Sequence, residues 1–198
     1  MLQESRNLRV GVLIMNAIEL MVKEHENISR MLVVVRKYCY KIIKNEEIDY
    51  DDFYKIIEFI RIYADKIHHG KEEDFLFNRM SEEIGGPAEK LVKHGMLVEH
   101  DLGRLYVSDL EAAIESFKAG NDEARVDIIG SAMSYVNLLT RHIEKENTVA
   151  YKFAERSLKE ESIQAVNEEC RKFEEEDIFN KKKYIKILEE LEEKITEA

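Results

Sequence analysis

The sequence predicts an all-α protein: an up-down-up-down antiparallel four-helix bundle with a C-terminal helical extension. Of its 198 residues, 44% are hydrophobic and 36% are charged, which is enough apolar material for a core. One Pro and eight Gly are too few for an all-β protein, which needs frequent turns. Apolar residues recur at helical spacing in four long segments joined by short connections, which is the pattern of a bundle.

The four helices are expected at about 16–44, 51–79, 87–118 and 122–156, and rare helix breakers separate them. Gly ends helices and Pro suits a first helical turn, while Asp is a favourable N-cap, so Asp49 or Asp51 can start the second helix. The connections are the polar stretch 44–49, the run Gly85-Gly86-Pro87 and the run Gly120-Asn121-Asp122. The predicted organisation is therefore an N-terminal segment at 1–15, the bundle at 16–156 and a charged extension at 157–198.

The extension has its own helical pattern. Its apolar positions are Ile178, Phe179, Tyr184, Ile185, Ile187, Leu188, Leu191 and Ile195. Such a pattern favours an amphipathic helix packed on the bundle or on a second subunit. The alternative is a docking helix for a partner protein, so a homodimer or a partner bound through 157–198 stays open.

The net charge and the cysteines limit which classes of partner and which cellular compartment we expect for this protein. A net charge of −11 argues against nucleic acid and against an anionic membrane surface, because both favour Lys and Arg. No apolar run approaches the ~20 residues of a membrane span, and the apolar patch near the N-terminus is too short for a signal peptide. Cys39 and Cys170 form no CxxC pair, so we expect inert thiols in a reducing compartment and a cytoplasmic protein.

The positions of the histidines are the main indication of function in this sequence. Each predicted bundle helix contains at least one, and counting from one end of the bundle places His25, His69, His100 and His142 at depths of roughly 13 to 21 Å. Two helices add a glutamate four residues later, in the pairs His69/Glu73 and His142/Glu146. This spacing puts both side chains on one helix face. We therefore expect one layer of four imidazoles and two carboxylates inside the bundle.

The second helix offers two overlapping registers, His68/Glu72 and His69/Glu73. Seven residues on either side of His69 lie Ile62 and Leu76, whereas Arg61 and Arg79 lie seven residues before His68 and after Glu72. This periodicity predicts that His69 and Glu73 point inward and that His68 is partly exposed. His94 lies well round the third helix from His100 and is expected not to bind metal.

A buried layer of this kind needs a counter-charge. Nitrogen and oxygen donors without thiolate suit iron, manganese or zinc better than calcium or magnesium. Four imidazoles and two carboxylates suit two metal ions, each with two histidines, sharing both glutamates as bridges.

At these residues the sequence resembles the hemerythrin-like family of HHE cation-binding domains, over about 16–156. The matching segments are Glu24-His25-Glu26, the run from His68 to Phe77, Glu99 to Arg104, and His142 to Asn147. The resemblance implies a bundle enclosing two non-haem iron ions with an oxo or hydroxo bridge. His25 and His69 would serve one iron, His100 and His142 the other, with Glu73 and Glu146 as bridges.

The sequence departs from the oxygen carriers of this family on the third helix, and this difference affects the function that we expect. The oxygen carriers of this family have two histidines spaced by four on the third helix, whereas Met96 and Arg104 occupy those positions around His100. Fewer protein ligands favour exogenous ligands and redox chemistry. We therefore expect a di-iron oxidoreductase or binding protein for O2, peroxide or nitric oxide. The alternatives are a module for iron or oxygen sensing or storage that signals through its extension, and an oxygen carrier.

Overall fold

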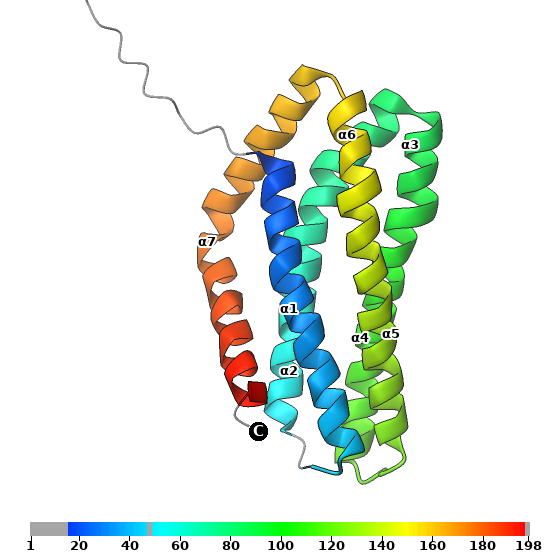
Figure 1. Ribbon diagram of the computed structural model, residues 1–198, viewed down its shortest axis with the longest axis vertical. Coiled ribbons are helices and arrows are strands. Elements are labelled where there is room, and N and C mark those ends of the chain that lie inside the picture. The colour runs from blue at the N-terminus through cyan, green and yellow to red at the C-terminus, as the bar shows by residue number, and fades with distance from the viewer. Residues whose placement is uncertain (1–15, 47–48, 197–198) are drawn as a thin grey trace, which may run out of the picture.

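The computed structural model describes residues 16–46 and 49–196, so the predicted N-terminal segment 1–15 lies outside the described residues. Four long helical stretches run alternately up and down (Figure 1). The first is α1 (Ala17–Ile43), and the second runs from α2 (Tyr50–Phe59) through η1 (Ile60–His69), η2 (Glu72–Phe77) and η3 (Met80–Ile84). The third comprises α3 (Gly86–Leu91), η4 (Val92–Met96) and α4 (Leu97–Lys118). The fourth comprises α5 (Ala124–Lys145), η5 (Glu146–Ala150) and α6 (Tyr151–Ser157). The predicted bundle is confirmed.

The helix ends follow local chemistry. The Asn16 side chain accepts hydrogen bonds from the backbone N–H groups of Ile18 and Glu19, at 3.0 and 3.1 Å, and so caps α1. Asp49 caps α2 in the same way. Between the second and third stretches Gly85 has φ 63°, a left-handed conformation that suits glycine, and Pro87 lies in the first turn of α3.

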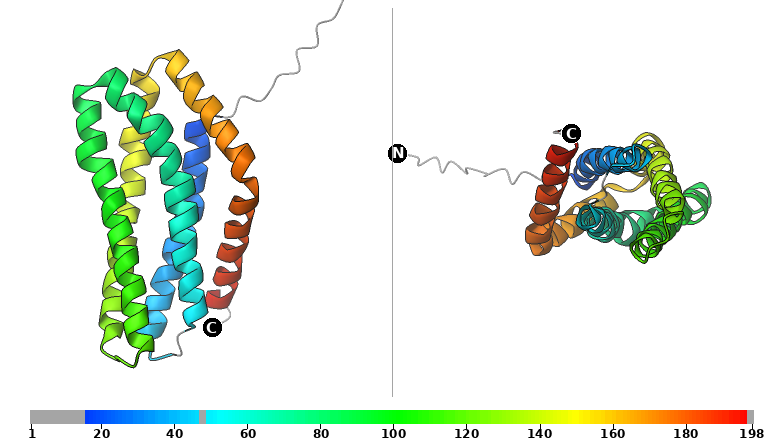
Figure 2. Two further views of the ribbon diagram at one scale, coloured as in Figure 1. Left: turned by 180° about the vertical axis from the view of Figure 1, so that it is seen from behind. Right: turned by 90° about the horizontal axis from the view of Figure 1, so that it is seen from below.

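The extension forms one long helix, α7 (Glu160–Thr196), which lies along the outside of α1 and the second stretch (Figures 1 and 2). Tyr184, Leu188 and Leu191 are buried and belong to the same apolar cluster as the bundle helices. The described part of the apolar face predicted for the extension is thus covered by the chain's own bundle, while the side chains of Ile178 and Phe179 lie outside what the structure describes.

Two apolar clusters fill the interior, and a polar layer separates them. Along α1 one cluster ends at Met21 and the other begins at Ile28. In the second stretch the change falls between Ile67 and Leu76, and the third and fourth stretches show the same interruption. His25, His69 and His100 lie in this gap in the first three stretches, while in the fourth His142 directly precedes Ile143 at the edge of the gap and Glu146 lies within it. Among the helices of the described residues, none has an apolar stretch long enough to cross a membrane.

Candidate metal centre

The interruption between the clusters is a layer of buried polar side chains. Its members come from all four helical stretches and are each at most 4% exposed: Glu24, His25, His68, His69, Lys71, Glu72, His100, His142 and Glu146. Burying this many ionisable groups is unfavourable unless they pair with each other or with a cation. Their pairing therefore shows what the layer can bind.

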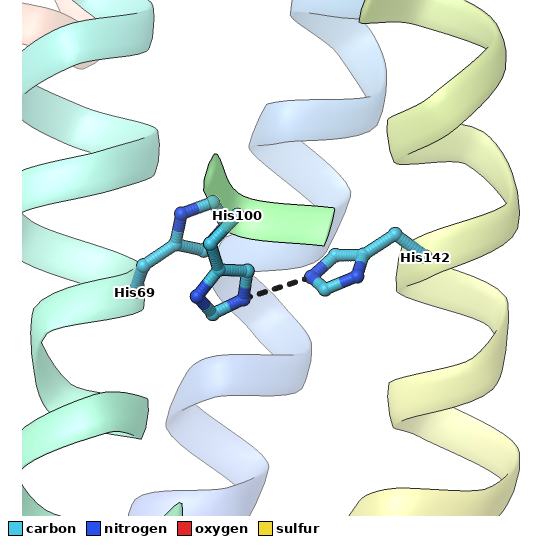
Figure 3. Close-up of side chains that lie close together, drawn as sticks. All are labelled: His69, His100 and His142. Atoms are coloured by element: carbon cyan, nitrogen blue, oxygen red, sulfur yellow. Dashed lines mark hydrogen bonds between the residues drawn. The ribbon is translucent and has the colours of Figure 1, made fainter. Parts of the chain in front are cut away.

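Four of the imidazoles form two facing pairs. Nε2 of His25 lies 2.8 Å from Nε2 of His68. Nε2 of His100 lies 3.0 Å from Nε2 of His142, the contact drawn as a dashed line in Figure 3. Each pair joins two neighbouring helical stretches, so the centre has two halves of similar construction.

The outer nitrogen of each paired imidazole faces an oxygen atom. Nδ1 of His25 lies 2.8 Å from Asn147 Oδ1, and Nδ1 of His68 lies 2.9 Å from Glu24 Oε2. In the other half, Nδ1 of His100 lies 2.7 Å from Glu73 Oε1, and Nδ1 of His142 lies 2.9 Å from Glu99 Oε2. Since these oxygens accept, each Nδ1 carries a proton, and in the neutral form of each ring Nε2 presents a lone pair.

Two neutral imidazoles that face each other through Nε2 at hydrogen-bond distance repel one another unless a proton or a metal cation lies between their lone pairs. Both imidazole pairs have this geometry. An imidazole whose Nδ1–H is held by an oxygen and whose Nε2 points inward is also the usual arrangement of a metal-binding histidine. The donor set therefore fits one cation at each pair.

Two buried glutamates lie between the pairs. Glu146 reaches both halves: its Oε2 lies 3.2 Å from His25 Nε2, and its Oε1 lies 3.0 Å from His142 Nε2. Oε2 of Glu72 lies 3.7 Å from His68 Nε2 and 3.6 Å from His100 Nε2. The other oxygen, Glu72 Oε1, accepts a 2.5 Å hydrogen bond from Tyr151. Both carboxylates are thus placed to bridge two cations.

The inward oxygens of these glutamates lack hydrogen-bond donors. Within the part of the chain that the structure describes, Glu72 Oε2 and both carboxylate oxygens of Glu146 are buried without a hydrogen-bond partner. Burial and the charge of Glu146 raise the pKa of Glu72 well above its usual value. Burial would also raise the pKa of Glu146, but the charge of His142 and contacts with the neighbouring imidazoles hold it well below normal. Unpartnered acceptors in a buried layer again fit bound cations.

His69 adds a fifth imidazole beside the second pair. Its ring stacks on His100 with centroids 3.8 Å apart (Figure 3), and its Nδ1 lies 3.2 Å from Asp65 Oδ1. Two groups of potential ligands result: His25, His68, Glu72 and Glu146 in one, and His69, His100 and His142 in the other. His94 is exposed and belongs to neither group.

A pocket opens beside the second group. It has a volume of about 290 Å³ and is lined by Ile60, Arg61, Asp65, His69, His100, Gly103, Arg104, Val107 and Tyr135. A Cβ atom at Gly103 would lie 3.5 Å from Leu139 and 3.6 Å from Tyr135, so α4 packs closely on α5 at the glycine that lines this pocket. A small molecule can therefore reach His69 and His100 from solvent.

The structure corrects the register predicted for the second helix. His68 is 1% exposed, so the prediction of partial exposure is wrong. Glu72 faces the centre, whereas the Glu73 side chain is 28% exposed and contacts His100 Nδ1 and Arg104. Of the six predicted ligands, the structure thus brings five into the two groups and places Glu73 outside them, as the residue that orients His100. The ligation itself stays a prediction.

Two physical causes explain the difference. A heptad periodicity holds only in a uniform α-helix, but η1 and η2 have the wider i→i+5 hydrogen bonding, which turns later residues about the axis. Arg79 also does not mark a solvent-facing side, because it lies beneath α7, where its guanidinium contacts Glu169 at 2.7 Å.

A pattern in the sequence does identify the inner register. Glu24-His25, then His68 and Glu72-Glu73, corresponds to Glu99-His100, then His142 and Glu146-Asn147, about 75 residues later. The contacts repeat as well. Glu24 contacts His68, as Glu99 contacts His142. The residue after each inner glutamate contacts the first histidine of the other half: Glu73 contacts His100, and Asn147 contacts His25. In this correspondence His142 matches His68, and Ile143 matches His69.

The fold and the centre together define a cation-binding helical-bundle protein with two buried His/Glu groups. Consistent with this class, residues 16–154 match the hemerythrin HHE cation binding domain, and the chain belongs to that family. Comparisons with curated proteins and with solved structures gave no match.

Proposed function

We propose that the centre holds two iron ions and that the protein binds or reduces a small oxidant: O2, peroxide or nitric oxide. One ion would be held by His25 and His68, and the other by His100 and His142 with His69 as a further imidazole. Glu72 and Glu146 would bridge them. The two imidazole pairs with converging Nε2 lone pairs support the two positions. Bound iron would supply one-electron chemistry and an exchangeable coordination position, through an oxo- or hydroxo-bridged pair.

The pocket beside His69 and His100 is the observation that supports exogenous ligands. Ile60, Val107 and Tyr135 give it an apolar wall, while Arg104 at its edge is paired with Asp65 and Glu73. An apolar wall suits uncharged diatomic molecules and peroxide. The protein would thus admit a small oxidant to one half of the centre and exclude large or charged molecules.

The first test is metal content and reactivity. Protein loaded anaerobically with Fe²⁺ should bind about two ions per chain, and its optical spectrum should change on addition of O2, peroxide or nitric oxide. His68→Ala and His142→Ala should each lose metal, while His94→Ala, an exposed histidine, should not. One ion or none in carefully loaded wild-type protein would contradict the di-iron centre.

The pocket gives a second test with a matched control. Gly103→Leu should fill the pocket and slow the reaction with peroxide at least tenfold while two ions stay bound. Gly130→Leu makes the same exchange at an exposed helical glycine with open space around it and should react like the wild type. Equal rates in both variants would show that the oxidant enters elsewhere.

A sensing or storage role is the second candidate, and the 2.6 Å contact of Lys181 in α7 with Glu24 Oε1 favours it. In that case metal or oxidant would change the protection of α7 from hydrogen exchange without catalytic turnover. A stable, reversible O2 adduct would instead indicate oxygen carriage.

A further inference from the structure

The C-terminal helix reaches the centre through Glu24. This carboxylate is 1% exposed and accepts from His68 Nδ1 through Oε2. Its Oε1 accepts from two lysines: Lys71, which is fully buried, and Lys181 of α7, at 2.6 Å. Glu24 thus connects the His68 imidazole to the Lys181 ammonium group, which lies on α7, outside the hemerythrin HHE domain at residues 16–154.

A second residue of α7 closes the network. Glu174 accepts from Lys71 through Oε1 and from Lys181 through Oε2, both at 2.6 Å. Two carboxylates and two ammonium groups therefore alternate in a ring. The Lys71 ammonium is desolvated and has its two carboxylate partners in this ring, one of them from α7. Charge-assisted hydrogen bonds of this kind are strong and fix their members in place.

The other half has no equivalent of this ring among the described residues. Glu99, which occupies the position of Glu24, bonds His142 and Lys145, and the Lys145 side chain is 42% exposed. Glu73, which bonds His100, pairs with Arg104, which is 40% exposed. The supports of the second half thus lie on the bundle and meet solvent. α7 breaks the symmetry of the two halves.

We propose that Glu174 and Lys181 of α7 are positioning residues of the metal centre, which hold Glu24 on His68 and so selectively stabilise the cation at the His25/His68 pair. The proposal rests on the proposed two-metal centre and adds a residue-level role for the helix outside it. Outer partners of metal-binding histidines commonly change metal affinity by about 10- to 100-fold when removed. The loss of metal affinity should affect the ion at the His25/His68 pair and not the ion at the His100/His142 pair.

The test is release of the two ions to a chelator from the full-length, Fe²⁺-loaded protein. The variant Lys181→Met/Glu174→Gln removes the ring contacts of α7 without changing net charge. We expect one ion to leave about tenfold faster or more, while the other leaves at the wild-type rate. Lys181→Arg, which keeps the charge and the donors, should restore slow release.

The matched control is Lys183→Met/Glu175→Gln on the same helix. Lys183 pairs with Glu58 and Glu175 with Arg171, so this variant loses the same two kinds of side chain without touching Glu24. Its release should equal that of the wild type. Thermal melts of both metal-free variants show whether either variant has lost stability in general. Such a loss would speed the release of both ions and not of one.

The outcomes separate the two proposals. If wild-type protein binds two ions and the Lys181/Glu174 variant releases both as the wild type does, or both faster, the role of α7 is wrong and the metal centre stands. If wild-type protein binds no metal, the centre is wrong and the role of α7 falls with it.

Discussion

At the scale of single residues, inner and outer carboxylates have different roles in the two halves of the centre. Glu72 and Glu146 are buried and point their unpartnered oxygens inward, while Glu24, Glu73 and Glu99 bond Nδ1 atoms from outside. Inner carboxylates neutralise bound cations directly. Outer ones fix the tautomer and the orientation of an imidazole.

This difference in role predicts different effects of the same substitution at the two positions. Glu146→Gln should lower metal affinity at both pairs, because Glu146 lies 3.2 Å from His25 Nε2 and 3.0 Å from His142 Nε2. Glu73→Gln should weaken only the ion at the His100/His142 pair, by about 10- to 100-fold. Metal titrations followed by optical spectra measure both, with circular dichroism to check helix content. The reverse ranking would restore Glu73 as the bridge.

The two cysteines give a prediction about pH. Burial raises the pKa of Cys39 to about 11 and that of Cys170 to about 12. A thiol whose pKa is higher in the folded than in the unfolded chain contributes stability below the unfolded pKa of about 8.5 and loses it as the pH rises through the folded value. The free energy of unfolding should therefore fall between about pH 9 and pH 12, by on the order of 2–3 kcal/mol per thiol.

Urea unfolding at several pH values measures this slope, and the double variant Cys39→Ala/Cys170→Ala should show a shallower one. Labelling of the folded protein by a thiol reagent should be slow at pH 8 and fast after unfolding. Fast labelling of the folded protein would contradict the burial of both thiols.

How far residues can be predicted from this sequence is clearest at the centre. Helical spacing and helix counting place His25, His100, His142 and Glu146 in one layer because the three histidines lie in the regular helices α1, α4 and α5, and Glu146 directly follows α5. The choice between His68 and His69 failed because it depended on a uniform turn through a π-helical region and on α7 being elsewhere. The outer partners depend on contacts between stretches, which periodicity within one helix cannot give.

At the scale of helices, α7 is held by its own apolar stripe as well as by ion pairs. Leu188 and Leu191 are fully buried, and Lys194 contacts the buried Asp52, which also accepts from Tyr38. The sequence predicted an apolar stripe in this region. It left open whether the bundle or a second chain covers it, because an amphipathic pattern describes a face and not its partner.

Truncation of this stripe should therefore destabilise the whole chain. Leu188→Ala should lower the free energy of unfolding by about 2–5 kcal/mol, through lost transfer energy and the cavity left behind. Lys186→Ala on the same helix, whose side chain is 77% exposed, should change it by less than about 0.5 kcal/mol. Denaturant unfolding of both variants compares them. Equal stabilities would show that α7 is not docked in solution.

At the scale of the whole molecule, metal binding should stabilise the fold, because the imidazoles and carboxylates of the centre come together only when all four stretches are packed. At free metal a thousandfold above its dissociation constant, the gain should be about 4 kcal/mol. Thermal melts with and without Fe²⁺ under anaerobic conditions measure it. The variant His68→Ala/His142→Ala should show little gain, and an equal gain there would place the stabilising metal elsewhere.

The polar layer also divides the hydrophobic interior into two parts, which affects cooperativity. Without bound cations, a layer of facing imidazoles and unpartnered carboxylate oxygens separates the two apolar clusters. α7 contributes Val166 and Cys170 to one cluster and Leu188 and Leu191 to the other. Each cluster can then open as a separate unit, with its own protection against hydrogen exchange. Bound cations would crosslink the four stretches at mid-height, and the two units would unfold as one.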